Sequence, residues 1–318
     1  MRFSQVDAFR GGDDMIRVIG HRGARGILPE NSLIGFEFTL STGTNLLEFD
    51  VVLTGDNVPV ITHNHRLHAP TFRGPDGRFL VGEEPKVSSL TLDEIGQFDI
   101  GRLDGLTDYG RRFPDQAQFD GVRVPRLSDL LRLVSEARFS DAHLMLELKS
   151  DPDLAGDADY RKTLVEVVVA EVRSANLDRR TILHSFDWNL LAECQRQAPD
   201  MPASYLTKLP DKADDAGEDS SRTVSPDFQG REDAVPDMVK EAGGMLWCPY
   251  YDDLTARTAA RARELGLCIA VWTVNEAADI DRMIDLGVDA IVSDYPGRVQ
   301  RRLSDRGFRW QLEQPGQQ

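Results

Sequence analysis

Residues 17–65 read RVIGHRGARGILPENSLIGFEFTLSTGTNLLEFDVVLTGDNVPVITHNH, and this stretch decides how we interpret the rest of the chain. It contains three short apolar runs typical of β-strands, at residues 17–21, 46–53 and 58–62. The runs carry or end in side chains suited to acid–base or metal chemistry: His21 and Arg22, Glu48 and Asp50, and His63. Apolar strand bodies tipped with acids, bases and cations predict a functional site along one rim of a sheet.

The second and third runs are predicted to form a β-hairpin. The residues TGDN at 54–57 have strong turn chemistry, and a parallel connection takes about a dozen residues or more. A turn centred between Asp56 and Asn57 places Asp50 opposite His63, and Glu48 shares a face with Asp50. We therefore expect two carboxylates and an imidazole to come together, where a divalent cation and a general acid or base can work side by side.

Beyond residue 122 the sequence alternates between strand-like and helix-like segments. Strands are expected at residues 143–149, 181–186, 203–207, 244–250, 268–274 and 290–294. Helices are expected near residues 127–136, 157–175, 189–197, 254–265 and 277–286. With the hairpin counted once, eight strand positions result, which indicates an α/β fold of the (β/α)₈ TIM-like barrel type with a β-hairpin at the second strand. We expect one domain over residues 1–318, with the barrel at about 16–305.

Three segments do not fit this alternation. Residues 1–15 are polar, and we expect them to cover the outside of the barrel or to fray. Residues 65–122 are rich in Gly, Pro, Asp and Arg, and we interpret them as an inserted segment after the hairpin that walls the site. The acidic residues 211–229 are interpreted as a lid.

Composition excludes several classes of protein. The formal net charge of −16 argues against a nucleic-acid-binding surface. No run approaches the roughly 18 apolar residues of a membrane span, and the N-terminus has no apolar core of a secretory signal. Cys194, Cys248 and Cys268 lie far apart in apolar surroundings. We interpret them as reduced core residues, which is typical of a cytoplasmic protein.

Three acidic side chains are candidate metal ligands. Glu48 and Asp50 lie on the hairpin, and Glu147 lies near the end of the strand HLMLELK. Three carboxylates form an all-oxygen ligand set, which favours a hard cation such as Mg²⁺, Ca²⁺ or Mn²⁺ over zinc. The alternative for Glu147 is a buried ion pair with Lys149, because both point into the barrel if either does.

The two histidines at strand ends are candidate acid–base groups. A single histidine at such a position is usually structural, but His21 and His63 are both expected near carboxylates. Arg22 lies beside His21 and can hold a phosphate or carboxylate through its planar guanidinium. The set therefore indicates acid–base chemistry around an anion.

Other polar or aromatic residues near the rim have weaker signals. His65 and His68 are interpreted as surface residues of the loop. For the strand TILHSF we favour Ser185 over His184 as the inward-facing residue. Trp272 is either core packing or an apolar wall for the carbon skeleton of a substrate.

These residues resemble the glycerophosphodiester phosphodiesterase family. The resemblance spans about residues 17–300, and its short motifs are specific through their order and spacing. The matching residues are His21-Arg22-Gly23, Pro29-Glu30-Asn31-Ser32, Glu48-Phe49-Asp50-Val51, Thr54, Asp56, Pro59-Val60, His63, Glu147-Leu148-Lys149, Ser185-Phe186, Trp272-Thr273-Val274-Asn275 and Asp294-Tyr295-Pro296. The family implies a TIM-like barrel with an inserted segment after the hairpin, as the alternation also indicates.

The resemblance also implies a reaction and roles. The reaction is the metal-dependent hydrolysis of a small-molecule glycerophosphodiester to glycerol 3-phosphate and an alcohol, a step of lipid and glycerol metabolism. The implied roles are His21 and His63 as the acid–base pair, Glu48, Asp50 and Glu147 as ligands of one divalent ion, Arg22 and Lys149 as partners of the phosphodiester, and Trp272 as the contact on the alcohol side. The nucleophile, water or a substrate hydroxyl, stays open, as do the alcohol and the oligomeric state.

Two alternative functions remain. One is a lysophospholipase D-like phosphodiesterase on the same barrel, with Phe72, Phe79 and Leu80 of the inserted segment shaping an apolar groove. The other is a non-catalytic protein that binds a phosphate ligand. It is suggested by Asn64, which stands where the family usually has an aspartate after the histidine.

Overall fold

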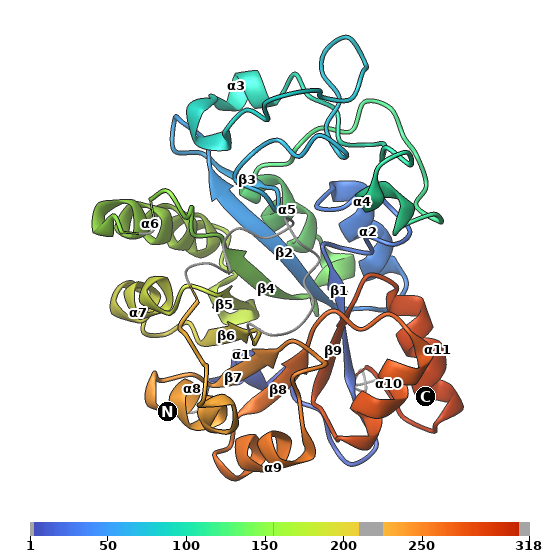
Figure 1. The fold of residues 1–318 in the computed structure, drawn as a ribbon, viewed down its shortest axis with the longest axis vertical. Helices are drawn as coiled ribbons and strands as arrows, with labels where there is room; N and C mark the ends of the chain where they lie inside the picture. The colour runs from blue at the N-terminus through green and yellow to red at the C-terminus, as the bar shows by residue number, and fades with distance from the viewer. Residues whose placement is uncertain (1–2, 155, 210–224, 312–318) are drawn as a thin grey trace.

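The computed structural model describes residues 3–154, 156–209 and 225–311, and in these residues eight parallel strands close into a ring (Figure 1). The strands of the ring are β1 (Arg17–His21), β2 (Leu46–Leu53), β4 (His143–Leu148), β5 (Thr181–Ser185), β6 (Ala203–Thr207), β7 (Leu246–Pro249), β8 (Cys268–Val271) and β9 (Ala290–Ser293). The ring closes because β1 pairs in parallel with both β2 and β9. The predicted (β/α)₈ barrel is confirmed.

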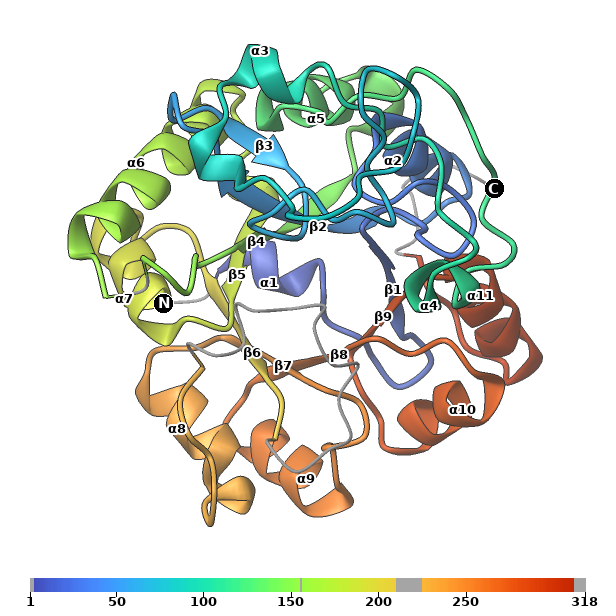
Figure 2. The same ribbon diagram turned by 45° about the horizontal axis from the view of Figure 1, so that its top comes forward.

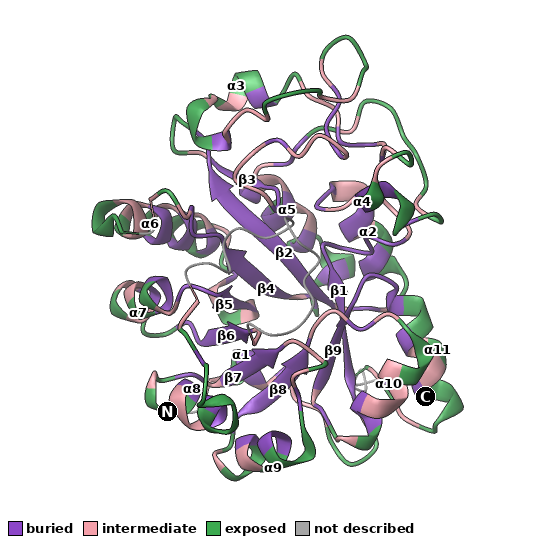
Figure 3. Ribbon diagram, viewed as in Figure 1, coloured by how far each residue is buried: buried purple, intermediate pink, exposed green. Residues whose placement is uncertain are grey.

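Helices surround the ring on its outside. They are α2 (Leu33–Ser41), α5 (Leu127–Val134), α6 (Ala158–Ser174), α7 (Trp188–Gln197), α8 (Val235–Glu241), α9 (Ala256–Glu264), α10 (Ala277–Asp285) and α11 (Pro296–Asp305). Figure 3 shows the strands buried and the outward faces of the helices exposed, so the main core lies between the two layers. Helix α2 begins after Ser32, whose hydroxyl accepts from the backbone N–H of Gly35. Ser32 is thus the N-cap of this helix.

The described part of the N-terminal segment closes one end of the barrel, so our expectation that residues 1–15 cover the outside or fray was wrong for Val6 and Phe9. Helix α1 (Ser4–Asp7) lies near the centre of the ring in Figure 2. Val6 and Phe9 pack with Ile19 and Leu46 inside the barrel, where Phe9 is 0% exposed. The physical reason is the hydrophobic effect, because these two apolar residues cover interior side chains that would otherwise meet water.

The hairpin forms as predicted, but its register differs by one residue. β3 (Pro59–Ile61) lies outside the ring and pairs antiparallel with β2, with Val51 opposite Ile61. The predicted opposition of Asp50 and His63 is therefore wrong. The turn is asymmetric: Asn57 has a φ of +58°, and the N–H of Thr54 donates to the carbonyl of Val58. A residue in the left-handed region shifts the centre of the turn.

The inserted segment, residues 65–122, is ordered around its own small core. It contains the 3₁₀ turn η1 (Val87–Ser89) and the short helices α3 (Leu92–Ile95) and α4 (Asp108–Arg111). Its apolar side chains pack on the hairpin in a cluster made by Val52, Val60, Leu67, Phe72, Val87, Ile95, Ile100 and Val124. Figure 1 shows the segment lying beyond the hairpin at one end of the molecule. Tyr109 of α4 packs in a separate small cluster with Leu103 and Phe113.

Two further expectations concern the lid and the membrane. The expected lid at residues 211–229 falls mostly on residues 210–224, which lie outside the described residues. Of the helices in the described residues, none has the length and apolar character needed to cross a membrane.

Candidate active site

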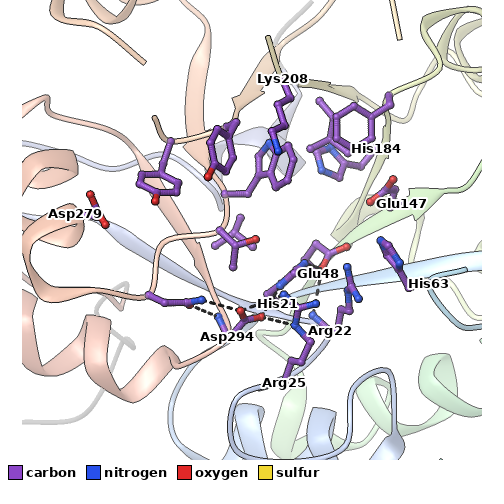
Figure 4. Close-up of a pocket in the computed structure, with 18 of the residues that line it drawn as sticks. His21, Arg22, Arg25, Glu48, His63, Glu147, His184, Lys208, Asp279 and Asp294 are labelled. Atoms are coloured by element: carbon purple, nitrogen blue, oxygen red, sulfur yellow. Dashed lines mark hydrogen bonds and ion pairs between the residues drawn. The ribbon is translucent and has the colours of Figure 1, made fainter. Parts of the chain in front are cut away.

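A pocket of about 350 Å³ opens at the carboxyl ends of the barrel strands (Figure 4). Six of the predicted site residues line it: His21, Arg22, Glu48, His63, Glu147 and Trp272. Asp50 and Lys149 are not in the lining, and both are almost completely buried. This end of the barrel is where the strands deliver polar side chains from different parts of the sequence, and the volume lies within the usual range for small-molecule sites.

The three carboxylates lie together as a compact acidic cluster. Glu48, Asp50 and Glu147 each offer an oxygen, and these oxygens lie within 4.8 Å of one another. Glu48 and Asp50 are neighbours on β2, and the parallel register places Glu147 of β4 beside Asp50. Glu48 Oε1 and Asp50 Oδ1 are buried without a hydrogen-bond partner in the described part of the chain. Buried carboxylate oxygens that lack hydrogen-bond partners fit the coordination of a hard divalent cation.

The pKa values of two members of the cluster are shifted in opposite directions. Burial raises the pKa of Glu48 well above its usual range, and the charges of Asp50 and Glu147 raise it further. Burial also acts to raise the pKa of Asp50, but Lys149, His63 and Arg22 hold it well below its usual range. Crowded acids of this kind repel one another when ionised, and a bound cation would relieve the repulsion.

Lys149 lies behind the carboxylates. Its Nζ donates to Glu147 Oε1 at 2.9 Å and lies 3.4 Å from Asp50 Oδ1, and the side chain is 0% exposed. The buried ion pair considered for Glu147 and Lys149 is therefore present, and it lies within the acidic cluster. Lys149 alone offsets only part of the charge of three carboxylates.

His21 is held by a buried carboxylate. Its Nδ1 lies 2.6 Å from Asp294 Oδ1, and its Nε2 lies 3.8 Å from Glu48 Oε2. Burial acts to raise the pKa of Asp294, but the charge of Arg25 and the hydrogen bonds from His21 and Arg25 keep it well below its usual range. Because an ionised carboxylate only accepts hydrogen bonds, Nδ1 of His21 carries the proton. Burial lowers the pKa of His21 to about 4 against the opposing effect of Asp294, so the neutral ring presents Nε2 as a base.

His63 has a different partner. It follows β3 at the end of the hairpin, and its Nδ1 lies 2.6 Å from Asn64 Oδ1. The amide oxygen accepts a hydrogen bond as a carboxylate does, but it carries no charge. Asn64 thus fixes the orientation of the imidazole without adding a negative charge beside it.

Arg22 is fixed by its backbone and by its side chain. Its φ is +50°, an uncommon conformation outside glycine, and its N–H donates to Glu48 Oε2 at 3.1 Å. The guanidinium pairs with Glu30 at 2.9 Å and lies 3.3 Å from Asp50. Asn31, with a φ of +53°, also donates to Asp50. The loop after β1 therefore holds its polar groups against the acidic cluster.

Trp272 forms an apolar wall of the pocket. Its Nε1 donates to the carbonyl of Cys248, and its ring lies edge-on to Phe186 and Tyr250, each at a centroid distance of 5.4 Å. Nε1 of Trp272 therefore has a hydrogen-bond partner in the protein, while the ring lines the pocket. The packing interpretation of this residue is confirmed, and its contact with a substrate stays a prediction.

The structure corrects three expectations for histidines. His184 lines the pocket, whereas Ser185 turns away and donates to the carbonyl of Leu148. The parallel register explains this, because His184 lies beside the inward-facing Glu147. Burial lowers the pKa of His184 to about 3. His65 and His68 are half-buried rather than on the surface.

Several functional candidates were not assigned from the sequence. Asp294 directly follows β9 and pairs with both His21 and Arg25, as Figure 4 shows. Lys208 enters the pocket from the end of β6, and its Nζ lies 4.6 Å from the ring centre of Tyr250. The sequence showed Asp294 as a charged residue at the end of a predicted strand. Its pairing with Arg25 had no signal in the sequence, because 269 positions separate the two residues.

Comparison with known proteins gives a consistent result. The model of the glycerophosphoryl diester phosphodiesterase family matches residues 21–298. The glycerophosphodiester phosphodiesterase of Caldanaerobacter subterraneus is 25% identical over 279 residues, which are 88% of this chain and 94% of that protein. A crystal structure from Silicibacter pomeroyi, described as a candidate glycerophosphoryl diester phosphodiesterase, is 50% identical with a TM-score of 0.91 and covers 98% of this chain and 100% of that one.

A more distant structure shares the fold. The Oleispira antarctica phosphodiesterase in complex with the product sn-glycerol-3-phosphate is 20% identical, with a TM-score of 0.67. The match covers 91% of this chain and 97% of that chain.

Proposed function

This chain belongs to the glycerophosphoryl diester phosphodiesterase family and is an enzyme that hydrolyses glycerophosphodiesters, and from that premise we propose its products, cofactor and catalytic groups. The products are glycerol 3-phosphate and a free alcohol, and the cofactor is one Mg²⁺ or Ca²⁺ ion. The observation that carries the proposal is the buried cluster of Glu48, Asp50 and Glu147 in the same site as His21 and His63. A structural relative that holds sn-glycerol-3-phosphate as its product supports the same product here.

The acidic cluster is the proposed metal site. Glu48, Asp50 and Glu147 would hold the ion, and the two carboxylate oxygens without hydrogen-bond partners in the described residues support this assignment. The bound ion supplies positive charge that stabilises the negative charge building on the phosphoryl oxygens. Lys149 keeps the cluster partly neutralised from behind, and its buried place argues for this action over direct contact with the substrate.

The two histidines divide the proton transfers. His21 is proposed as the base, because its Nδ1 proton is held by Asp294 and its Nε2 is free of protons at neutral pH. His63 is proposed as the acid that protonates the leaving alcohol from the other side of the site. Arg22 orients the phosphodiester, and Trp272 packs against the alcohol. The group that His21 deprotonates is water or the neighbouring glycerol hydroxyl.

The decisive experiment measures release of glycerol 3-phosphate from glycerophosphocholine by the purified protein. We expect turnover with added Mg²⁺ or Ca²⁺, and loss of turnover with a chelator. His63→Ala and His21→Ala should each lower kcat at least about 100-fold. His143→Ala is the matched control, because His143 lies at the opposite end of the barrel and hydrogen-bonds to the carbonyl of Asp141.

Two results would overturn the proposal. Turnover that survives both the chelator and His63→Ala would exclude the mechanism. Tight binding of glycerol 3-phosphate without turnover under any divalent metal would identify a binding protein instead, the alternative raised by Asn64.

The proposed location is the cytoplasm. The three cysteines are buried and unpaired in the structure, as expected from the sequence. Free buried thiols are typical of reducing compartments and support this location.

A further inference from the structure

Helix α4 of the inserted segment brings a buried tyrosine to the edge of the active site. Tyr109 is 8% exposed, and its ring lies edge-on to His68 at 4.8 Å and to Phe113 at 5.5 Å between centroids. Thr107 caps the helix by accepting from the N–H of Gly110. A side chain at Gly110 would lie 1.9 Å from the carbonyl oxygen of Asp104, so the helix is seated too closely for any other residue there. The ring contacts and this close approach at Gly110 fix the position of the hydroxyl, whereas the cap stabilises the helix.

The hydroxyl of Tyr109 makes two hydrogen bonds to charged residues of the barrel. It donates to Glu30 Oε2 and accepts from Arg25 Nη1 at 3.2 Å. A phenol can donate one hydrogen bond and accept others, so both interactions are satisfied together. Glu30 and Arg25 both belong to the loop that follows β1, on either side of its turn.

Glu30, the first partner of the Tyr109 hydroxyl, connects it to the acidic cluster through Arg22. Glu30 Oε1 accepts from Arg22 Nη1 at 2.9 Å. Arg22 in turn donates its backbone N–H to Glu48 and lies 3.3 Å from Asp50 through Nε. The Glu30 carboxylate therefore sets where the guanidinium of Arg22 lies.

Arg25, the second partner of the Tyr109 hydroxyl, connects it to His21, the proposed base, through Asp294. Arg25 makes a bidentate pair with Asp294, with Nε to Oδ1 at 2.9 Å and Nη2 to Oδ2 at 3.1 Å. Asp294 Oδ1 also accepts from His21 Nδ1. A bidentate pair is geometrically specific, so the orientation of Arg25 is transmitted to the carboxylate that orients His21.

We propose that Tyr109 is a positioning residue that sets Arg22 and His21 together, so that the inserted segment is part of the catalytic apparatus as well as a wall. The inference rests on the proposed function, which assigns the roles of Arg22 and His21. The competing interpretation is that Tyr109 only anchors the inserted segment by packing. The two differ in what the hydroxyl does, because the ring supplies the packing and the hydroxyl supplies the connection to Glu30 and Arg25.

The test is Tyr109→Phe, which keeps the ring and removes the hydroxyl. We expect kcat on glycerophosphocholine to fall about tenfold or more, with KM changed less than about threefold, because misplaced groups act mainly on the transition state. The melting temperature should stay close to that of the parent protein. In the metal-free protein, the NMR signal of the His21 Nδ1 proton should shift or broaden.

Two control variants separate positioning from packing. Tyr205→Phe removes another buried hydroxyl, one that donates to the carbonyl of Ala242 outside the site, and should leave kcat unchanged. Thr107→Ala removes the cap of α4 without touching the hydroxyl of Tyr109, and should lower the melting temperature while kcat of the folded protein stays within about twofold.

A double-mutant cycle tests the route through Glu30. If Tyr109 acts through this residue, Tyr109→Phe should lower kcat less than about twofold in the Glu30→Gln background. An unchanged kcat for Tyr109→Phe, or a loss that only follows the fraction of unfolded protein, would overturn the inference. Absence of turnover in the parent protein would instead overturn the proposed function, so the two failures are distinguishable.

Discussion

The two histidines of the pocket illustrate how a single neighbour sets the chemistry of a side chain. His21 is held by Asp294, a charged carboxylate, whereas His63 is held by Asn64, a neutral amide. Both partners fix a protonated Nδ1 and direct the other nitrogen away from themselves. A carboxylate favours the charged imidazole and an amide does so less, so the two rings are electrostatically unequal.

Glu48 provides the first prediction at the scale of residues. Glu48→Gln should stabilise the metal-free protein at neutral pH, because the raised pKa of Glu48 means that ionising it opposes folding. The same change should abolish the stabilisation by added Mg²⁺ or Ca²⁺. In the parent protein that stabilisation should be about 2–3 kcal/mol at roughly 100 times the dissociation constant.

Chemical denaturation with and without metal measures both effects. The control is Glu166→Gln, on the exposed face of α6, which should change neither quantity. A Glu48→Gln protein that metal stabilises as strongly as the parent would show that Glu48 is not a ligand.

Glu30 provides a prediction for pH dependence. Burial alone would raise its pKa, but Arg22, Arg25 and Tyr109 lower it from 4.5 to about 2. A depressed carboxyl pKa stabilises the fold above the unfolded value and loses that effect as pH falls toward the folded value. Glu30→Gln should therefore cost on the order of 3 kcal/mol above pH 4.5, and the cost should shrink as the pH falls from 4.5 toward 2.

Urea denaturation of both proteins between about pH 7 and pH 3 measures this difference in free energy of unfolding. The exposed Glu241 supplies the comparison, since Glu241→Gln should give a small difference that does not vary in this way. A cost for Glu30→Gln that is constant with pH would contradict the ionic origin of the effect.

At the scale of elements, short segments outside the regular alternation determine how the barrel is completed. Helix α1 has only four residues, yet the segment buries Val6 and Phe9 against the interior of the ring. The inserted segment likewise has short helices but builds a core on the hairpin. Both segments are held by packing rather than by helix propensity, because helices this short are not stable alone.

Phe9 tests the contribution of the N-terminal segment. Phe9→Ala should lower the free energy of unfolding by about 3–5 kcal/mol, because it empties a site that is 0% exposed at the end of the barrel. Phe9→Leu, which refills most of the space, should cost clearly less. Denaturant titration measures both, and a cost below about 1 kcal/mol for the alanine variant would show that the segment does not seal the barrel.

At the scale of the whole molecule, barrel and inserted segment together enclose the pocket. The barrel contributes the acidic cluster and the aromatic wall, and the inserted segment contributes Arg112 to the lining. A pocket of about 350 Å³ lies at the small end of the range for ligand sites. Its size suits a glycerophosphodiester with a small alcohol.

This enclosure predicts substrate choice. We expect kcat/KM for glycerophosphocholine to exceed that for lysophosphatidylcholine at least about 100-fold, because a long acyl chain on the glycerol exceeds the pocket. Release of choline measures both reactions, with the lysophospholipid kept below its micellar concentration. Comparable rates would favour the lysophospholipase D-like alternative.

The sequence by itself determined the architecture and the membership of the acidic cluster. The alternation of apolar runs predicted the ring, and β1 and β2 begin and end at the expected residues. Periodicity and turn chemistry are local properties, so they can be recognised without the fold. The placement of Glu48, Asp50 and Glu147 on parallel strands was likewise readable, because parallel strands deliver polar side chains to the same rim.

Only the tertiary structure decided the partners of these groups. The hairpin register depends on the left-handed Asn57, and the inward place of His184 depends on pairing between β4 and β5. Asp294 reaches His21 across 273 residues because the ring closes between β9 and β1. Tyr109 reaches Glu30 because the inserted segment folds back on the barrel. Such contacts follow from closure and packing of the whole chain, which no local pattern encodes.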